Sequence, residues 1–197
     1  MNVLLLGSGG REHAIAWRLA QSPLMGKLWV APGTAGTSMF GESVEGVRIT
    51  EPAEVVALAE RVKADLVVVA PDDPLAAGVV DALDAAGVAA FGPTKAADEI
   101  EWSKSYAKSL MRDAGIATAA SAAFDDPDRA VEYVRGRDGP CDVKADGLSL
   151  GQGVTGCDNA EQAVAAIDAA MRGGAFGAAG ARVVIEERMY GRETSAH

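Results

Sequence analysis

The sequence predicts an α/β protein in which a doubly wound parallel sheet is followed by a smaller α+β module. Within the first 95 residues, four short apolar runs, each followed by a turn rich in glycine or proline, alternate with helical segments. The apolar runs are continuous rather than alternating, which is typical of strands buried on both faces of a parallel sheet. After Pro93 the order of elements changes. We therefore expect a domain boundary near residue 100, with ligands bound at the carboxyl ends of the first strands.

Each element of the first half follows from its local sequence. Residues 3–6 are apolar, and the glycine turn after them opens a helix with one apolar face. A second helix has proline and glutamate in its first turn, and a third is closed by Gly87; both are helix-end signals. The predicted strands are residues 3–6, 27–33, 65–74 and 88–93, and the predicted helices are residues 11–21, 51–64 and 75–87.

The second half begins with a charged helical stretch over residues 95–115, in which we expect a break near Trp102. A glycine-rich segment at residues 146–153 separates two strands and predicts a loop. The order strand-helix-strand-loop-strand-helix-strand indicates a small α+β module. Its strands are predicted at residues 119–124, 141–145, 154–157 and 182–187, and its helices at residues 127–137 and 160–171.

Composition and charge exclude several classes of protein. The 197 residues include 49% hydrophobic and 23% charged side chains, which is ordinary for a globular protein. A net charge of −10 without a basic stripe argues against a nucleic-acid binder. No apolar run is long enough to span a membrane, and the N-terminus lacks the basic region of a signal peptide. Cys141 and Cys157 lack metal-ligand spacing. We expect a cytoplasmic protein without nucleic-acid or membrane partners.

The glycine turn after the first strand has the features of a phosphate site. Gly7, Gly9 and Gly10 lie between strand and helix, where free N–H groups and the helix dipole favour an anion. Arg11 adds a fork-shaped cation. Glu12 stands where a dinucleotide fingerprint needs its third glycine, and no Walker A lysine follows, so NAD-type binding is disfavoured. Two interpretations stay open: a phosphate cradle, or a turn needed only for strand-to-helix packing.

Two segments of the second half suggest a nucleotide. Lys144 lies on a strand and is followed by the glycine loop, an arrangement that can clamp a triphosphate. The alternative is a half-exposed lysine before a flexible hairpin. The last strand ends in Glu186, Glu187 and Met189, which could present backbone amides and an apolar side chain to a purine. Acid-rich strand ends are also common on surfaces, so each segment alone is weak.

Together these segments resemble one known family. The ordered motifs are GSGGREHA, APGTAGT, PDDPLAAGVVDAL, FGPTKAADEIEWSKSYAK, VKADGLSLGQGV and FGAAGARVVIEERMYGRETS. In this order they resemble the glycinamide ribonucleotide synthetases, which are ATP-grasp ligases, and the resemblance covers essentially the whole chain.

The resemblance implies a fold and an activity. It implies a doubly wound pre-ATP-grasp domain over residues 1–100 and a truncated ATP-grasp domain over residues 101–197. The second would contain linker helices at about 101–118 and a lid subdomain at about 119–190. The activity would be the ATP-dependent ligation of glycine to 5-phosphoribosylamine, giving glycinamide ribonucleotide, ADP and phosphate in purine biosynthesis. ATP would phosphorylate the glycine carboxylate before the sugar amine attacks the acyl phosphate.

The resemblance also implies roles for individual residues. Magnesium would bridge the ATP phosphates, its protein ligands being expected beyond residue 197, and no catalytic residue is assigned. Phosphoribosylamine would be held by Gly7, Gly9, Gly10, Arg11, Pro71, Asp72 and Asp73. ATP would be held by Lys104 and Lys144, by a lid containing Gly147, Gly151 and Gly153, by a hinge containing Glu186, Glu187 and Met189, and by Glu193 at the ribose.

Three departures from the family pattern qualify this assignment. Gln152 replaces the usual lid lysine, which removes a charge-assisted phosphate contact of about 1.5–3 kcal/mol. Asp142 interrupts an otherwise apolar strand, where it either pairs with Lys144 or lies at a solvated strand end. The chain is also roughly half the family's length. The alternative is therefore a truncated, inactive paralogue or fragment that only binds nucleotide or sugar phosphate.

Overall fold

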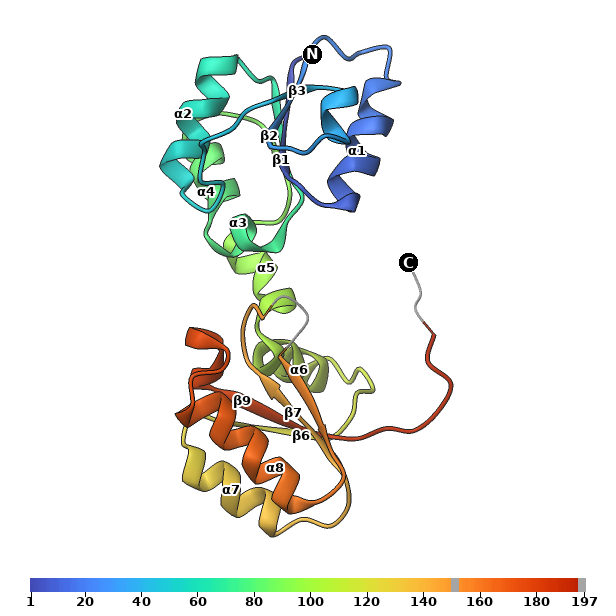
Figure 1. Cartoon of the computed structure of the whole chain (residues 1–197), viewed down its shortest axis with the longest axis vertical. Helices are drawn as coiled ribbons and strands as arrows, with labels where there is room; N and C mark the ends of the chain where they lie inside the picture. Colours follow the sequence, from blue (N-terminus) through green and yellow to red (C-terminus); the bar gives the residue numbers. More distant parts are fainter. Residues whose placement is uncertain (150–152, 195–197) are drawn as a thin grey trace. The chain divides into compact units, whose positions relative to one another are not determined.

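The computed structural model describes residues 1–149 and 153–194. The chain divides into two compact units, Met1–Glu99 and Ile100–His197. Figure 1 shows a sheet with flanking helices in each. No helix in the described part of the chain is long and apolar enough to cross a membrane.

The first unit is built on a parallel sheet with strand order β3-β2-β1-β4-β5. The chain runs from β1 outward to β2 and β3, then returns to β4 beside β1, so the strand order reverses between β1 and β4. Such a switch point brings together the loops that follow the two strands. The strands are β1 (Val3–Gly7), β2 (Leu28–Pro32), β3 (Glu42–Ser43), β4 (Leu66–Val69) and β5 (Ala90–Phe91).

Helices cover both faces of this sheet, which confirms the doubly wound class. Alternate residues of β1 point to opposite faces: Leu4 and Leu6 pack with α2 and α4 residues, and Val3 and Leu5 with α1 residues. Figure 1 shows α1 on one side of the sheet and α2 and α4 on the other. The helices are α1 (Gly10–Ala20), α2 (Pro52–Val62), α3 (Asp72–Ala76) and α4 (Val79–Ala85), and the 3-10 turn η1 is Thr37–Met39.

Two boundary predictions for this unit were wrong. The segment predicted as one helix at 75–87 forms parts of two helices, because Gly78 has φ +86° and interrupts the helical backbone between them. The first of them begins at Asp72, so the strand predicted to reach residue 74 ends at Val69. The two-residue strand β3 was not predicted, because Glu42 and Ser43 carry no apolar pattern.

Two further helices lead into the second sheet. Helix α5 (Lys95–Trp102) ends where the break near Trp102 was predicted. Helix α6 (Lys104–Asp113) begins next, and the Ser103 hydroxyl caps it by accepting the Tyr106 N–H at 3.2 Å. Serine is a preferred helix cap, so the break is encoded locally.

The second unit contains an antiparallel sheet with strand order β6-β9-β7-β8. One face packs against α7 and α8 through alternate residues such as Val143 and Ile185. Figure 1 shows α7 and α8 on this face and α6 on the other. The strands are β6 (Ser121–Phe124), β7 (Cys141–Ala145), β8 (Val154–Cys157) and β9 (Val183–Glu187); the helices are α7 (Pro127–Arg135) and α8 (Ala160–Ile167), with a π turn η2 (Asp168–Arg172) and a 3-10 turn η3 (Gly177–Ala181).

Candidate functional site

The polar face of the second sheet carries the candidate site. Because side chains alternate along a strand, Asp142, Lys144 and Glu186 point away from the apolar face that packs on α7 and α8. Asp142 on β7 lies directly opposite Glu186 on β9. This face therefore gathers ionisable groups beneath α6.

Glu186 is the centre of a buried ion-pair network. Its side chain is 8% exposed, and its two carboxylate oxygens pair with the ammonium groups of Lys108 and Lys144. Burial alone raises the pKa of Glu186, but the hydrogen bonds from the two lysines outweigh it and lower the pKa below its ordinary value. The carboxylate is therefore ionised at neutral pH, and the cluster keeps one net positive charge.

Lys108 links this network to the segment before β6. Its ammonium also donates to the Thr118 hydroxyl at 2.6 Å and to the Ala119 carbonyl at 3.1 Å. Sequence reasoning missed Lys108 as a site residue. A signal was present, because Lys108 follows Lys104 by four residues and the two share one helix face.

Lys104 contacts the beginning of the glycine loop. Its ammonium donates to the Gly147 carbonyl at 3.2 Å. Burial lowers the pKa of Lys104, and the nearby Asp146 carboxylate opposes this shift. Asp146 accepts the Ser105 N–H at 3.0 Å, which fixes the loop to the first turn of α6. The loop and the helix that carries the lysines are thus tied together.

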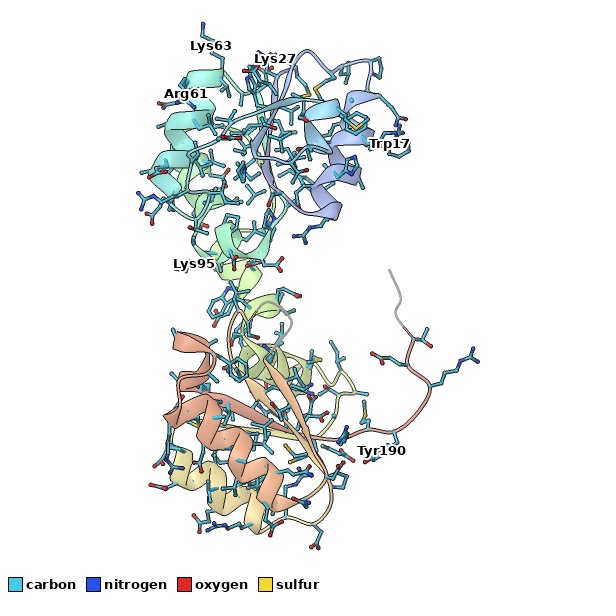
Figure 2. All side chains as sticks on the ribbon, in the orientation of Figure 1. Trp17, Lys27, Arg61, Lys63, Lys95 and Tyr190 are labelled. Atoms are coloured by element: carbon cyan, nitrogen blue, oxygen red, sulfur yellow. The ribbon has the colours of Figure 1, made fainter. Side chains whose placement is uncertain are left out.

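A groove opens at the end of β9 beside this network. It has a volume of about 550 Å³, within the range of small-molecule sites. It is lined by Ala119, Asp142, Lys144, Glu186, Glu187, Met189, Tyr190, Gly191, Arg192 and Glu193. The groove thus brings together Lys144 and the hinge and ribose residues proposed from the sequence. Tyr190, labelled in Figure 2, is 77% exposed on the segment after β9.

A second hollow also borders the lysine–glutamate pair. Its volume is about 330 Å³, and it shares Lys144 and Glu186 with the groove. It adds Lys104 and Lys108, and its wall is otherwise mainly apolar. The pair therefore borders two cavities, and three lysines converge on them.

The glycines of the predicted lid are only partly described. Gly151, with its neighbour Gln152, lies outside the described residues. A Cβ on Gly147 would lie 2.8 Å from the Cβ of Ala179, so the loop leaves β7 in close contact with η3. The Gly153 carbonyl accepts the Ala145 N–H at 2.8 Å and closes the loop onto β7.

Asp142 contacts an arginine that sequence reasoning did not consider. Lys144 takes Glu186 as its partner, whereas Asp142 lies 3.8 Å from the Nε of Arg188. Arg188 also pairs with Asp158 at 3.0 Å. Asp142 is therefore neither paired with Lys144 nor left at a solvated strand end.

The switch point of the first unit brings together the residues proposed for the sugar phosphate. A Cβ on Gly7 would lie 2.8 Å from the Cγ of Pro71, so the turns after β1 and β4 touch. The Arg11 guanidinium lies 2.9 Å from the Glu12 carboxylate and 3.7 Å from that of Asp72. Asp73 lies beside Asp72 in the first turn of α3.

Glu12 occupies part of the anion position at the start of α1. Its side chain is buried and accepts the Gly9 N–H at 2.6 Å, as in a capping box. The chain's own carboxylate therefore satisfies a donor that a phosphate would use. This contact favours the packing interpretation of Gly9, and a phosphate there would have to displace Glu12.

The described residues contain no cluster of three or more side chains of the types that usually bind metals. No group of three or more His, Cys, Asp or Glu side chains that could hold an ion occurs within residues 1–149 and 153–194. Cys141 and Cys157 face each other across β7 and β8 as buried free thiols. We assign no magnesium ligand to any of these residues.

Two family descriptions match the chain end to end. Residues 1–101 match "Phosphoribosylglycinamide synthetase, N domain". Residues 102–197 match "Phosphoribosylglycinamide synthetase, ATP-grasp (A) domain". The family resemblance inferred from the motifs is confirmed.

Curated relatives and solved structures agree with this match. The phosphoribosylamine–glycine ligase of Mesorhizobium japonicum is 50% identical over 195 residues, which are 99% of this chain and 45% of the relative. That of Pasteurella multocida is 47% identical over 197 residues, covering 99% of this chain and 46% of the relative. The chain thus spans about half the length of the curated relatives it matches.

The structural comparisons confirm the fold class. The crystal structure of the Thermotoga maritima phosphoribosylamine–glycine ligase superposes with a TM-score of 0.77 at 30% identity, covering 98% of this chain and 45% of that one. An ADP complex of N5-carboxyaminoimidazole ribonucleotide synthetase gives a TM-score of 0.69 at 13% identity, covering 95% and 47%, which shows the fold alone.

Proposed function

Because the chain belongs to the phosphoribosylglycinamide synthetase family, we propose that it supplies the substrate and ATP-binding parts of a ligase of cytoplasmic purine biosynthesis. The reaction joins glycine to 5-phosphoribosylamine and converts ATP to ADP and phosphate. One observation carries the nucleotide part of this proposal: the groove at the end of β9 is bordered by the buried Lys108–Glu186–Lys144 network.

In this proposal the nucleotide lies along the groove with its phosphates toward the lysines. Met189, which is 72% exposed, offers an apolar side chain to the purine, and Glu193 takes the ribose hydroxyls. Lys144, which lines both cavities, and Lys104, which lines the second, meet the phosphates, and the glycine loop that begins at Gly147 is assigned to the lid. The contact between Lys104 and the Gly147 carbonyl supports this arrangement, because it holds a cation at the start of the loop.

The proposed chemistry proceeds in two balanced steps. An oxygen of the glycine carboxylate attacks the γ-phosphorus of ATP, and ADP leaves with the electrons of the broken P–O bond. The amine nitrogen of phosphoribosylamine then attacks the acyl carbon, phosphate leaves, and the nitrogen loses a proton. The lysines of this chain orient the phosphates and offset the charge that develops on them. Magnesium would accompany ATP and offset the charge of its phosphates; the described residues contain no cluster of three or more His, Cys, Asp or Glu side chains for it, and we assign it no step.

The sugar phosphate is proposed to bind at the switch point of the first sheet. The glycine turn with Arg11 and the turn from Pro71 to Asp73 touch there, which supports a shared site. Arg11 would exchange a carboxylate partner for the phosphate. Because Glu12 already accepts the Gly9 N–H, a phosphate that used this donor would have to displace Glu12.

A second candidate function is nucleotide or sugar-phosphate binding without ligation. It is favoured by Gln152, which stands where the family's lid usually has a lysine and therefore removes one cation from the proposed phosphate site. The two functions share the nucleotide groove and differ only in turnover.

Calorimetric titration of the 197-residue chain with Mg·ATP tests the proposal, with Lys144→Ala and Arg11→Ala as matched variants. We expect saturable ATP binding that Lys144→Ala weakens by about tenfold or more, the value of a charge-assisted contact. Arg11→Ala should leave it nearly unchanged. Equal effects would contradict the division of roles between the two units.

A coupled assay separates the two candidates. ADP release that depends on both glycine and phosphoribosylamine would support ligation by this chain, and ATP binding without release would support the second candidate. Binding of NADH but not ATP would contradict both.

A further inference from the structure

The position of Asp142 creates an electrostatic problem on the groove wall. Asp142 lies directly opposite Glu186 in the β7–β9 register, and both side chains line the groove. Like charges directly opposite each other destabilise a sheet. Glu186 has two lysine partners, but Asp142 has neither of them. A separate cation is needed to balance Asp142.

Arg188 provides this cation. It directly follows the last residue of β9, and its contact with Asp142 places its guanidinium on the face of the sheet that carries Asp142 and Glu186. Its Nε lies 3.8 Å from an Asp142 oxygen, and its Nη1 lies 3.0 Å from an Asp158 oxygen. The Arg188 side chain is 33% exposed and that of Asp142 is 24% exposed, so the contact between them is partly shielded from water.

The backbone of β8 provides a seat for the Arg188 guanidinium. Gly156 is the register partner of Asp142 on β8. A Cβ on Gly156 would lie 2.8 Å from the Nη2 and 3.0 Å from the Cζ of Arg188. The guanidinium thus rests where any larger residue at position 156 would place its side chain. The residues at positions 142, 156 and 188 therefore fit one another.

We propose that Arg188 is a positioning residue of the nucleotide groove, which holds Asp142 on the Gly156 side and prevents it from competing with ATP phosphates for Lys144. This inference rests on the proposed function, since it assigns Lys144 to ATP. Asp142 and Lys144 share one face of β7, two residues apart, and both line the groove. Without Arg188, an unbalanced carboxylate would attract the Lys144 ammonium and repel the phosphates.

A double-mutant cycle measured by ATP titration of the full chain tests this role. Arg188→Met removes the charge and keeps an unbranched side chain, and Asp142→Val restores an apolar strand residue. We expect Arg188→Met to weaken ATP binding about three- to tenfold, as for one partly screened charge. Asp142→Val should bind ATP as tightly as the wild type or more tightly. The double variant should return to within about twofold of the wild type.

Two further variants separate this role from general damage. Arg172 also bridges two aspartates, Asp128 and Asp168, at a site that does not line the groove. Arg172→Met is therefore the matched control and should bind ATP like the wild type. Gly156→Ala keeps Arg188 but displaces its guanidinium, so it should weaken ATP binding in the same direction as Arg188→Met. It provides the test if Arg188→Met does not fold.

Several results would overturn the inference. One is unchanged ATP binding in Arg188→Met, or in Gly156→Ala where Arg188→Met does not fold. Another is a double variant as weak as Arg188→Met, which would mean that Arg188 acts on the nucleotide directly. If the wild type itself binds no ATP, the proposed nucleotide function fails, and this inference fails with it.

Discussion

The charge of the groove depends on one buried carboxylate and the two lysines that hold it. Glu186 has 8% of its side chain exposed and Lys108 has 12%, so their ion pair is shielded from water. A buried charge left without its partner is costly, because the desolvation is no longer offset. Lys108 therefore stabilises the buried carboxylate of Glu186. It also weakens the electrostatic attraction between Glu186 and Lys144, because it neutralises part of the charge on Glu186.

We predict that Lys108→Met lowers the free energy of unfolding by about 3 kcal/mol, the usual cost of breaking a buried pair. The comparison variant is Lys27→Met, which breaks a Lys–Glu pair whose side chains are 51% and 60% exposed. That loss should stay below about 1 kcal/mol. Urea unfolding followed by circular dichroism measures both. Similar losses in the two variants would mean that the Lys108 pair contributes no more than a surface pair.

The lowered pKa of Glu186 predicts how its contribution depends on pH. A carboxyl whose pKa is lower in the folded than in the unfolded chain stabilises the fold above the unfolded pKa. That contribution is lost as the pH falls through the folded pKa, which for Glu186 lies below the ordinary 4.5. The gap in unfolding free energy between wild type and Glu186→Gln should therefore be constant from pH 7 to about pH 5 and shrink below about pH 4.5. A gap that stays constant down to pH 3 would show that Glu186 acts through packing.

At the scale of elements, the sequence predicts strands and helices well where buried apolar residues recur in a regular pattern. It predicts their ends poorly where a residue with positive φ terminates the element. Gly78 has φ +86° and separates α3 from α4. We predict that Gly78→Ala destabilises the protein by about 1–2 kcal/mol, because a Cβ is strained in the left-handed region. Gly10 is the control, since it begins α1 and a Cβ there would meet nothing within 4 Å. Gly10→Ala should be neutral or slightly stabilising, and equal losses in thermal melts would refute the assignment to strain.

The same contrast explains which parts of the fold were predictable. The apolar runs of β1 and β4 are buried on both faces, so their sequences alone identify parallel strands. Strand β3 has two residues and no apolar pattern, so it depends on pairing with β2 and leaves no local signal. The sequence alone does not distinguish the roles of Gly87 and Gly78. Only the folded backbone shows that Gly78 divides a helix.

From the sequence, we could predict only those residues of the candidate site that lie in family motifs. Lys144, Glu186 and Met189 were found through the family motifs, and the structure places them on one groove. Lys108 was missed because its role depends on a contact with Glu186, which lies 78 residues away in the sequence. Arg188 was missed because its role depends on contacts that extend from the end of β9 across β7 to β8. The hydrogen bond from the Gly9 N–H to the Glu12 carboxylate was also not predicted. From the sequence alone, Glu12 was noted only because it replaces the third glycine of a dinucleotide fingerprint.

At the scale of the whole molecule, the two units have separate apolar cores. One core face of the first unit contains Leu4, Leu58 and Leu83, and the core of the second contains Val143, Ile167 and Ile185. We propose that ATP binding depends on the second core alone, because the described residues that line the groove and the adjoining hollow all lie in the second unit, from Ile100 onward.

This independence predicts opposite outcomes for two matched core truncations. Leu4 and Ile185 are both almost fully buried, so Leu4→Ala and Ile185→Ala should each destabilise their own unit by about 2–5 kcal/mol. Leu4→Ala should nevertheless leave the ATP dissociation constant within about twofold of the wild type, whereas Ile185→Ala should weaken or abolish binding, because Ile185 supports the strand that carries Glu186. Calorimetric titration at a temperature where the second unit remains folded measures both constants. A large loss of ATP binding in Leu4→Ala would show that the first core supports the groove, and the two units would then have to be treated as one cooperative structure.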